Sequence, residues 1–184
     1  MKYQPLIVLA LALAACATPV TGADAAGAQT APAAAPPPPC EDAAYHQFDF
    51  WVGNWDVYDT GGNLAGTNSI QPEEYGCLLV ERWVNTSGIT GQSYNFYDPV
   101  AGEWRQLWVS GGAVIDYSGG LTPSGSMLLT GEIHNRRAGT SAPFTGEWTL
   151  NDDGSVTQHF RQQDTETGEW SDWFVGKYVR QAAE

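Results

Sequence analysis

Short runs of alternating apolar and polar residues fill the chain from residue 55 to residue 180. No segment of comparable length keeps the 3.6-residue spacing of apolar positions that marks an amphipathic helix. Alternation with a period of two is typical of strands that bury one face. The pattern predicts strands over residues 55–59, 64–71, 77–85, 92–97, 104–110, 114–119, 126–133, 143–150, 155–162 and 170–180.

The segments between these runs have the chemistry of tight turns. Thr60–Asn63, Asp98–Gly102 and Asn151–Gly154 each hold a glycine that can adopt positive φ and an Asp or Asn that can bond its own backbone. Short turns make neighbouring strands antiparallel, and a long meander leaves exposed edges unless it closes. We therefore predict an all-β fold, an up-and-down antiparallel barrel of about ten strands, with a β-sandwich as the alternative. A short helix near Ala44–Phe50 would cover one mouth of the barrel.

The first residues follow a different pattern. Lys2 precedes an apolar run, Leu6–Ala15, which is too short to span a bilayer and is typical of a cleaved export signal. The run ends in Leu13-Ala14-Ala15-Cys16, which resembles the lipobox of bacterial lipoproteins. The resemblance implies cleavage before Cys16 and a lipid on that cysteine. An ordinary secretory signal is the alternative.

Residues 17–39 are rich in alanine and proline and offer no large apolar side chain besides Val20. Nothing in this segment offsets the entropy cost of ordering it, so we interpret it as an extended tether. The expected organisation is a signal peptide over 1–15, a lipidated tether over 16–39 and a barrel domain over 40–184. Ala17 lacks the aspartate that retains enteric lipoproteins in the inner membrane, so the resemblance implies the outer membrane, facing the periplasm.

The charge balance narrows the range of partners. Eight basic residues stand against 21 acidic ones, and loss of Lys2 with the signal makes the formal charge −14. This excess argues against nucleic acid and against anionic lipid surfaces, which leaves the lipid anchor as the only expected membrane contact. Export to an oxidising compartment also predicts a disulfide between Cys40 and Cys77, with two free thiols as the alternative.

Five motifs of the domain stand out: Phe48–Val57, Gly76–Trp83, Asn95–Pro99, Gly102–Trp108 and Phe174–Arg180. Together they resemble a family of uncharacterised bacterial proteins, the domain of unknown function 1579 (DUF1579) type. The resemblance implies a lipocalin-like (calycin) barrel and no particular activity. Gly53-Asn54-Trp55 also resembles the Gly-x-Trp signature that begins lipocalin barrels. In that superfamily a basic residue of the last strand packs over this tryptophan. Arg180 has the matching position, so the resemblance implies that Trp55 and Arg180 together close the barrel.

Strand alternation separates two sets of side chains. One set is aromatic and polar; its members Glu81, Trp83, Asn95, Gln106 and Trp108 are the candidate ligand-binding residues, because small ligands use apolar walls with a few placed polar groups. The other set is largely aliphatic. We expect the mixed set to point into the barrel. Two alternatives remain: the mixed set covers the exterior, or the barrel has a packed lower half and an open upper half, with each set contributing to one half.

The chain shows no recognisable catalytic or metal-binding motif. His46, His134 and His159 have no metal-ligand spacing, and no phosphate loop or nucleophile elbow is present. The last strand carries Lys177 where related barrels place the histidine that binds heme, so we expect no cofactor. The leading hypothesis is a module that binds a small apolar or amphipathic ligand. The alternative is a filled barrel with a structural or assembly role through protein contacts in the envelope; an enzyme ranks third.

Overall fold

The computed structural model describes residues 40–182. The predicted signal peptide, lipidated Cys16 and tether therefore lie outside the described residues. Within the described range, no helix is long and apolar enough to cross a membrane.

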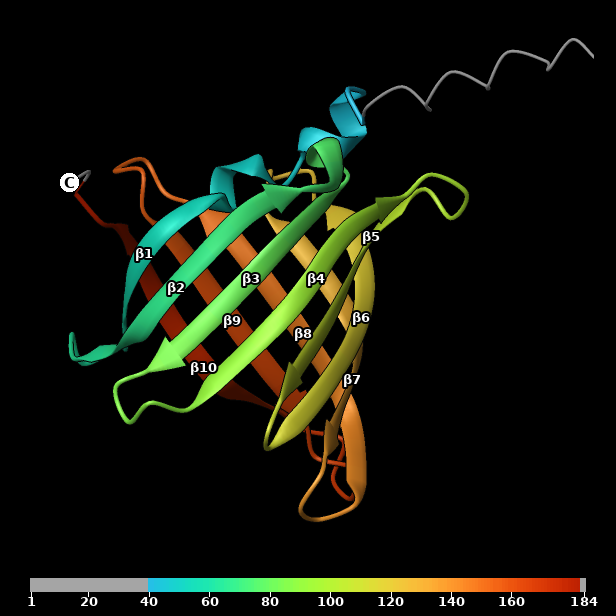
Figure 1. Ribbon diagram of the computed structural model, residues 1–184. Coiled ribbons are helices and arrows are strands. Elements are labelled where there is room, and N and C mark those ends of the chain that lie inside the picture. Colours follow the sequence, from blue (N-terminus) through green and yellow to red (C-terminus); the bar gives the residue numbers. More distant parts are fainter. Residues whose placement is uncertain (1–39, 183–184) are drawn as a thin grey trace, which may run out of the picture. The chain divides into compact units, whose positions relative to one another are not determined.

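Ten antiparallel strands close into one barrel (Figure 1). Each strand pairs with its neighbours in sequence, and the first strand pairs with the last, so the sheet has no free edge. The predicted up-and-down barrel is confirmed. The strands are β1 (Gly53–Tyr58), β2 (Leu64–Glu73), β3 (Leu78–Asn85), β4 (Thr90–Asp98), β5 (Glu103–Ser110), β6 (Ala113–Leu121), β7 (Met127–Asn135), β8 (Thr140–Leu150), β9 (Val156–Gln163) and β10 (Trp170–Arg180).

The expected helix near Ala44–Phe50 is two short 3-10 turns, η1 (Ala43–His46) and η2 (Asp49–Trp51). Phe48 separates them with φ −108° and ψ 7°. Because 3-10 geometry places residues three apart on one face, Phe48 and Trp51 project together and stack with ring centroids 4.9 Å apart. Both side chains are fully buried, so this segment closes one mouth of the barrel.

We call this mouth the closed end. The two turns are held there by aromatic contacts, with the Phe48 ring centroid 5.7 Å from that of Trp104 and 5.2 Å from that of Trp148. Trp104 Nε1 also donates to the carbonyl of Ala44 at 3.1 Å. A third short turn, η3 (Glu74–Gly76), joins β2 to β3 at the same end (Figure 1). The opposite mouth, formed by the β1–β2, β3–β4, β5–β6, β7–β8 and β9–β10 turns, is the open end.

Arg180 joins the last strand to the first at the closed end. It is the register partner of Trp55, and its guanidinium carbon lies 4.2 Å from the Trp55 ring centroid. Its Nη1 donates to the carbonyl of Val52 at 2.9 Å and its Nη2 to that of Phe50 at 3.4 Å. A Cβ at Gly53, whose φ is +144°, would overlap Nη1, so glycine is needed for this approach. The stacking expected from the lipocalin resemblance is present.

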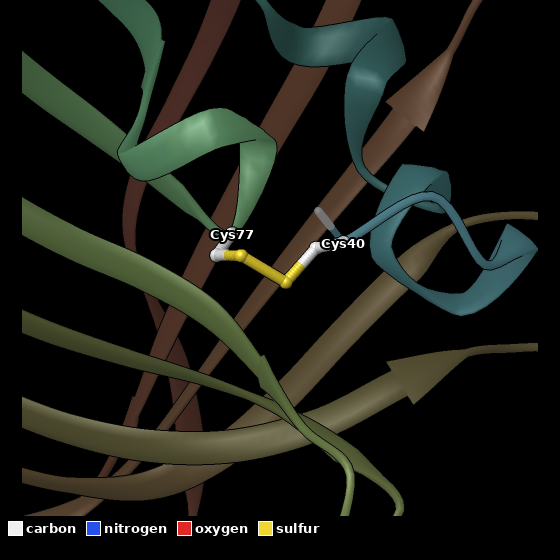
Figure 2. Close-up of a disulfide and its surroundings, with 2 residues drawn as sticks. All are labelled: Cys40 and Cys77. Atoms are coloured by element: carbon white, nitrogen blue, oxygen red, sulfur yellow. A yellow bond between two sulfur atoms is a disulfide. The ribbon is translucent and has the colours of Figure 1, made fainter. Parts of the chain in front are cut away.

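A disulfide joins Cys40 to Cys77, with their Cα atoms 5.1 Å apart (Figure 2). It ties the segment that precedes η1 to the residue that follows η3. The two cysteines are 37 residues apart in sequence. In the chain-entropy treatment a bridge closing a loop of this size stabilises the fold by about 3–4 kcal/mol. The predicted pairing is confirmed.

We predict that replacing Arg180 with methionine lowers the free energy of unfolding by about 1 kcal/mol, because an exposed cation–π contact and its backbone hydrogen bonds are lost together. Lysine at this position should give a smaller loss, since it keeps the charge but cannot reach both carbonyls. Urea unfolding followed by tryptophan fluorescence measures both changes. The control is Lys177→Met. Lys177 lies on the same strand as Arg180 and forms an exposed ion pair with Asp153, which the substitution removes. Equal losses in Arg180→Met and the control would contradict the closure role.

Candidate ligand-binding site

The mixed aromatic and polar face points into the barrel. Glu81 is only 3% exposed, whereas Tyr94 and Leu107 of the aliphatic set are 50% and 40% exposed. The expected inward face is therefore confirmed by burial. The interior is also divided, because aromatic side chains fill the closed end and two cavities lie toward the open end.

Cross-strand pairing brings the polar residues of this face together. Glu81 of β3 is opposite Ser93 of β4, and Asn95 of β4 is opposite Gln106 of β5. Ser93 is also opposite Trp108, whose ring lies where a Cβ of Gly91 would be. The missing side chain of Gly91 thus makes room for the indole. The register places this tryptophan beside the polar cluster.

Glu81 lies at the centre of a buried hydrogen-bond network. Its Oε1 accepts from Asn68 Nδ2 and its Oε2 accepts from Ser93 Oγ, each at 2.6 Å. Asn68 Nδ2 also donates to Tyr178 Oη at 3.1 Å, and Tyr178 Oη donates to Gln158 Oε1 at 3.0 Å. Donors from β2 and β4 therefore converge on one carboxyl group, and Asn68 links this group to Tyr178 of β10 and Gln158 of β9.

Asn95 and Gln106 extend this network away from the carboxyl group. Asn95 Nδ2 donates to Ser93 Oγ at 2.8 Å and to the carbonyl of Leu79 at 3.0 Å. Gln106 Nε2 donates to Asn95 Oδ1, and Tyr117 Oη donates to Gln106 Oε1. Both amide groups are thus hydrogen-bonded to other protein groups. Asn95 contacts Ser93 directly and orients its hydroxyl group toward Glu81.

Burial raises the pKa of Glu81 to about 7, although the hydrogen bonds from Ser93 and Asn68 act in the opposite direction. Burial also raises the pKa of Tyr117 and of Tyr178 well above 10, and the nearby Glu81 carboxylate adds to both shifts. Both phenols therefore remain protonated donors at neutral pH. The Glu81 carboxyl group is the part of this network that changes its charge near neutrality.

Two adjoining cavities open above the network. The deeper one has a volume of about 280 Å³ and reaches Glu81, Gln158 and Tyr178; the outer one has a volume of about 390 Å³. Trp83, Trp108 and Trp173 line both. The rest of the deeper lining is Ala65, Asn85, Ile115, Phe160 and Phe174.

Three of the five candidate residues, Glu81, Trp83 and Trp108, meet at the deeper cavity. Asn95 and Gln106 are not in the lining of either cavity and lie within the network instead. These two amides therefore lie beneath the cavities and do not line them. Asn95 positions Ser93, and Gln106 in turn holds Asn95.

The last strand supplies cavity residues that alternation does not predict. β10 changes register against β9 between Asp172 and Phe174, which makes Trp173 the extra residue of a bulge. Because of the bulge, both Trp173 and its neighbour Phe174 reach the deeper cavity. Strict alternation would have turned one of them outward. The clustering of Trp170, Trp173 and Phe174 near the chain end was the one available signal.

The remaining candidate chemistry lies outside the cavity. Each histidine pairs with a carboxylate: His46 with Asp49 at 2.8 Å, His134 with Glu132 at 4.0 Å, and His159 with Asp172 at 2.7 Å. Among residues 40–182, no group of three or more His, Cys, Asp or Glu side chains is placed to hold a metal ion.

A scan against models of known protein families finds no match, and neither does a search of curated proteins. The resemblance to the DUF1579 type therefore stays a prediction, carried by the motifs that this sequence contains.

We predict that Glu81 makes the stability of the fold fall as the pH rises through the range between its unfolded and folded pKa values, 4.5 and about 7. The folded state binds the proton more tightly than the unfolded chain, so the contribution is complete below pH 4.5 and lost above about pH 7. Relative to Glu81→Gln, the wild type should lose roughly 2–3 kcal/mol between about pH 5 and about pH 8.

Urea unfolding of both proteins at several pH values measures this difference. Glu169→Gln, which removes an exposed carboxylate that makes no ion pair among the described residues, should follow the wild-type curve. Parallel curves for the wild type and Glu81→Gln would show that Glu81 does not titrate in this range.

Proposed function

We propose that this chain is a lipoprotein whose barrel binds a small apolar or amphipathic molecule at the outer membrane, on the periplasmic side. The observation that carries the proposal is the deeper cavity of about 280 Å³, which has aromatic walls and a polar floor at Glu81. Ligand sites combine mostly apolar walls with a few convergent polar groups, at volumes of roughly 300–1,000 Å³. The deeper cavity alone is slightly smaller than this range, and the adjoining outer cavity of about 390 Å³ extends the space into it.

The cavities favour this function over the structural alternative. A barrel that serves only as a scaffold would be filled, because empty apolar space costs stability at every lining side chain. The closed end shows that this sequence can fill a barrel, with Phe48, Trp51 and Trp148 fully buried there. Toward the open end, in contrast, three tryptophans line open space.

The proposed location in the cell rests on the export pattern of residues 1–15 and on the lipobox resemblance at Cys16. The disulfide between Cys40 and Cys77 supports it, because such bridges persist in oxidising compartments. A single covalent lipid anchor would be the only membrane contact. The acidic charge excess makes nucleic acid an unsuitable partner.

We predict that the mature chain binds the neutral apolar dye N-phenyl-1-naphthylamine, with enhanced dye emission and quenching of tryptophan fluorescence. Ala142→Phe, which adds a ring to the outer cavity wall, should weaken binding at least tenfold. Thr130→Phe places the same ring on the exposed outer face of β7 and should bind like the wild type. Absence of dye binding, or equal binding by all three proteins, would contradict the proposal.

We predict that the chain expressed in a bacterium with two membranes loses residues 1–15 and gains the mass of acyl chains at Cys16. Intact mass spectrometry of the membrane fraction measures both changes. Cys16→Ala should remove the acyl mass and release the domain from that fraction after export. A mature amino terminus without acyl chains would remove the lipoprotein part of the proposal and leave the binding part in place.

A further inference from the structure

We propose that the cavity selects ligands that carry an organic ammonium group, which the Glu81 carboxylate holds while the rest of the ligand packs against the tryptophans. This inference rests on the proposed binding function and names its ligand class. It follows from the charge, the hydrogen-bond capacity and the aromatic walls of the cavity, which are separate observations.

The first observation is the charge of the walls. Among the described residues that line the two cavities, Glu81 is the only acidic or basic side chain that can become charged near neutral pH. No lysine, arginine or histidine of the described range is part of either lining. A ligand with a carboxylate or phosphate group would therefore find no cation and would face a like charge in a poorly screened interior. The cavity excludes anions and favours cations.

The second observation is an excess of hydrogen-bond acceptors beside the cavity. Each carboxyl oxygen of Glu81 accepts one hydrogen bond from the protein, whereas an ionised carboxylate can accept about four in total. Its neighbour Asn68, which is 2% exposed and is not in the lining of either cavity, has an Oδ1 without a donor among the described residues. An alkylammonium group supplies up to three N–H donors at one point, which matches the acceptor capacity that the Glu81 carboxylate leaves unused beside the cavity.

The third observation is the position of the aromatic rings relative to the carboxyl group. Trp83 follows Glu81 by two residues on the same face of β3, and Trp108 is opposite Ser93, which bonds Glu81. Trp173, half exposed, joins them at the rim of both cavities. Indole faces attract cations and also bind apolar groups. A molecule with an ammonium group and an apolar body can therefore place the ammonium group at Glu81 and pack its apolar body against the tryptophans.

The side chains packed around Glu81 couple this recognition to pH. Asn68 of β2 and Ser93 of β4 donate to it, and Tyr117 of β6 and Tyr178 of β10 are neutral phenols near it, so no neighbour supplies a fixed charge. With a pKa of about 7, Glu81 is partly protonated in the free protein at neutral pH. An ammonium ion binds the ionised form, so its binding releases this proton.

Three probes of similar size and different charge test the proposal: phenethylamine, 2-phenylethanol and 3-phenylpropanoate. Titration calorimetry with the mature chain at about pH 8 should show the amine binding at least tenfold more tightly than the alcohol, with no detectable binding of the carboxylate. Lowering the pH to about 6 should weaken the amine roughly tenfold, because Glu81 must first lose its proton. The alcohol should change less than threefold.

Glu81→Gln keeps the shape of the side chain and removes its charge. This variant should abolish both the preference for the amine and its pH dependence while still binding the alcohol. Glu169→Gln, which removes an exposed carboxylate that makes no ion pair among the described residues, should retain the wild-type pattern. If Glu81→Gln does not fold, the pH dependence of the wild type still decides the question.

The outcomes separate the two proposals. Alcohol binding that equals or exceeds amine binding at about pH 8 overturns the ammonium selectivity and leaves the binding function intact. An amine affinity that does not change between about pH 8 and about pH 6 has the same consequence. If neither the three probes nor N-phenyl-1-naphthylamine binds, both the binding function and the ammonium selectivity are wrong.

Discussion

Closure of the sheet is the constraint on which the rest of this structure depends. Pairing of β1 with β10 removes both free edges of a ten-stranded meander and separates an inside from an outside. The Arg180 guanidinium fixes this seam, because it stacks on Trp55 of the first strand and bonds the carbonyl groups of Phe50 and Val52. The turn segment before β1 is thereby held over the closed end.

Once the barrel is closed, the interior can hold groups that an open sheet would leave in water. Glu81 remains buried because Asn68 and Ser93 donate to its two oxygens, and three further amides, those of Asn95, Gln106 and Gln158, extend the network. Burial in turn gives this carboxyl group a pKa near neutrality. The same enclosure gathers three tryptophans around the two cavities. The chemistry of the site is thus a result of topology as much as of residue type.

The sequence predicts the barrel well because each strand is a local pattern with a local turn signal. Alternation also sorts the side chains into two faces, and the aromatic and polar composition of one face, with Glu81, Trp83 and Trp108, favours it as the inward one, as burial shows. It fails where the structure departs from a period of two, as at the bulge that brings both Trp173 and Phe174 inside. It also cannot distinguish a cavity wall from a buried network. Asn95 has the alternation of a wall residue, yet its partners are set by distances across strands that only the structure supplies.

The disulfide gives the barrel a defined polarity. Cys40, the first described residue, is bound to Cys77 at the closed end, whereas the cavities lie toward the turns of the opposite end. The chain therefore enters the described domain at the closed end. The covalent cross-link of the described residues thus stabilises the plugged end and leaves the turns around the cavities free to move apart.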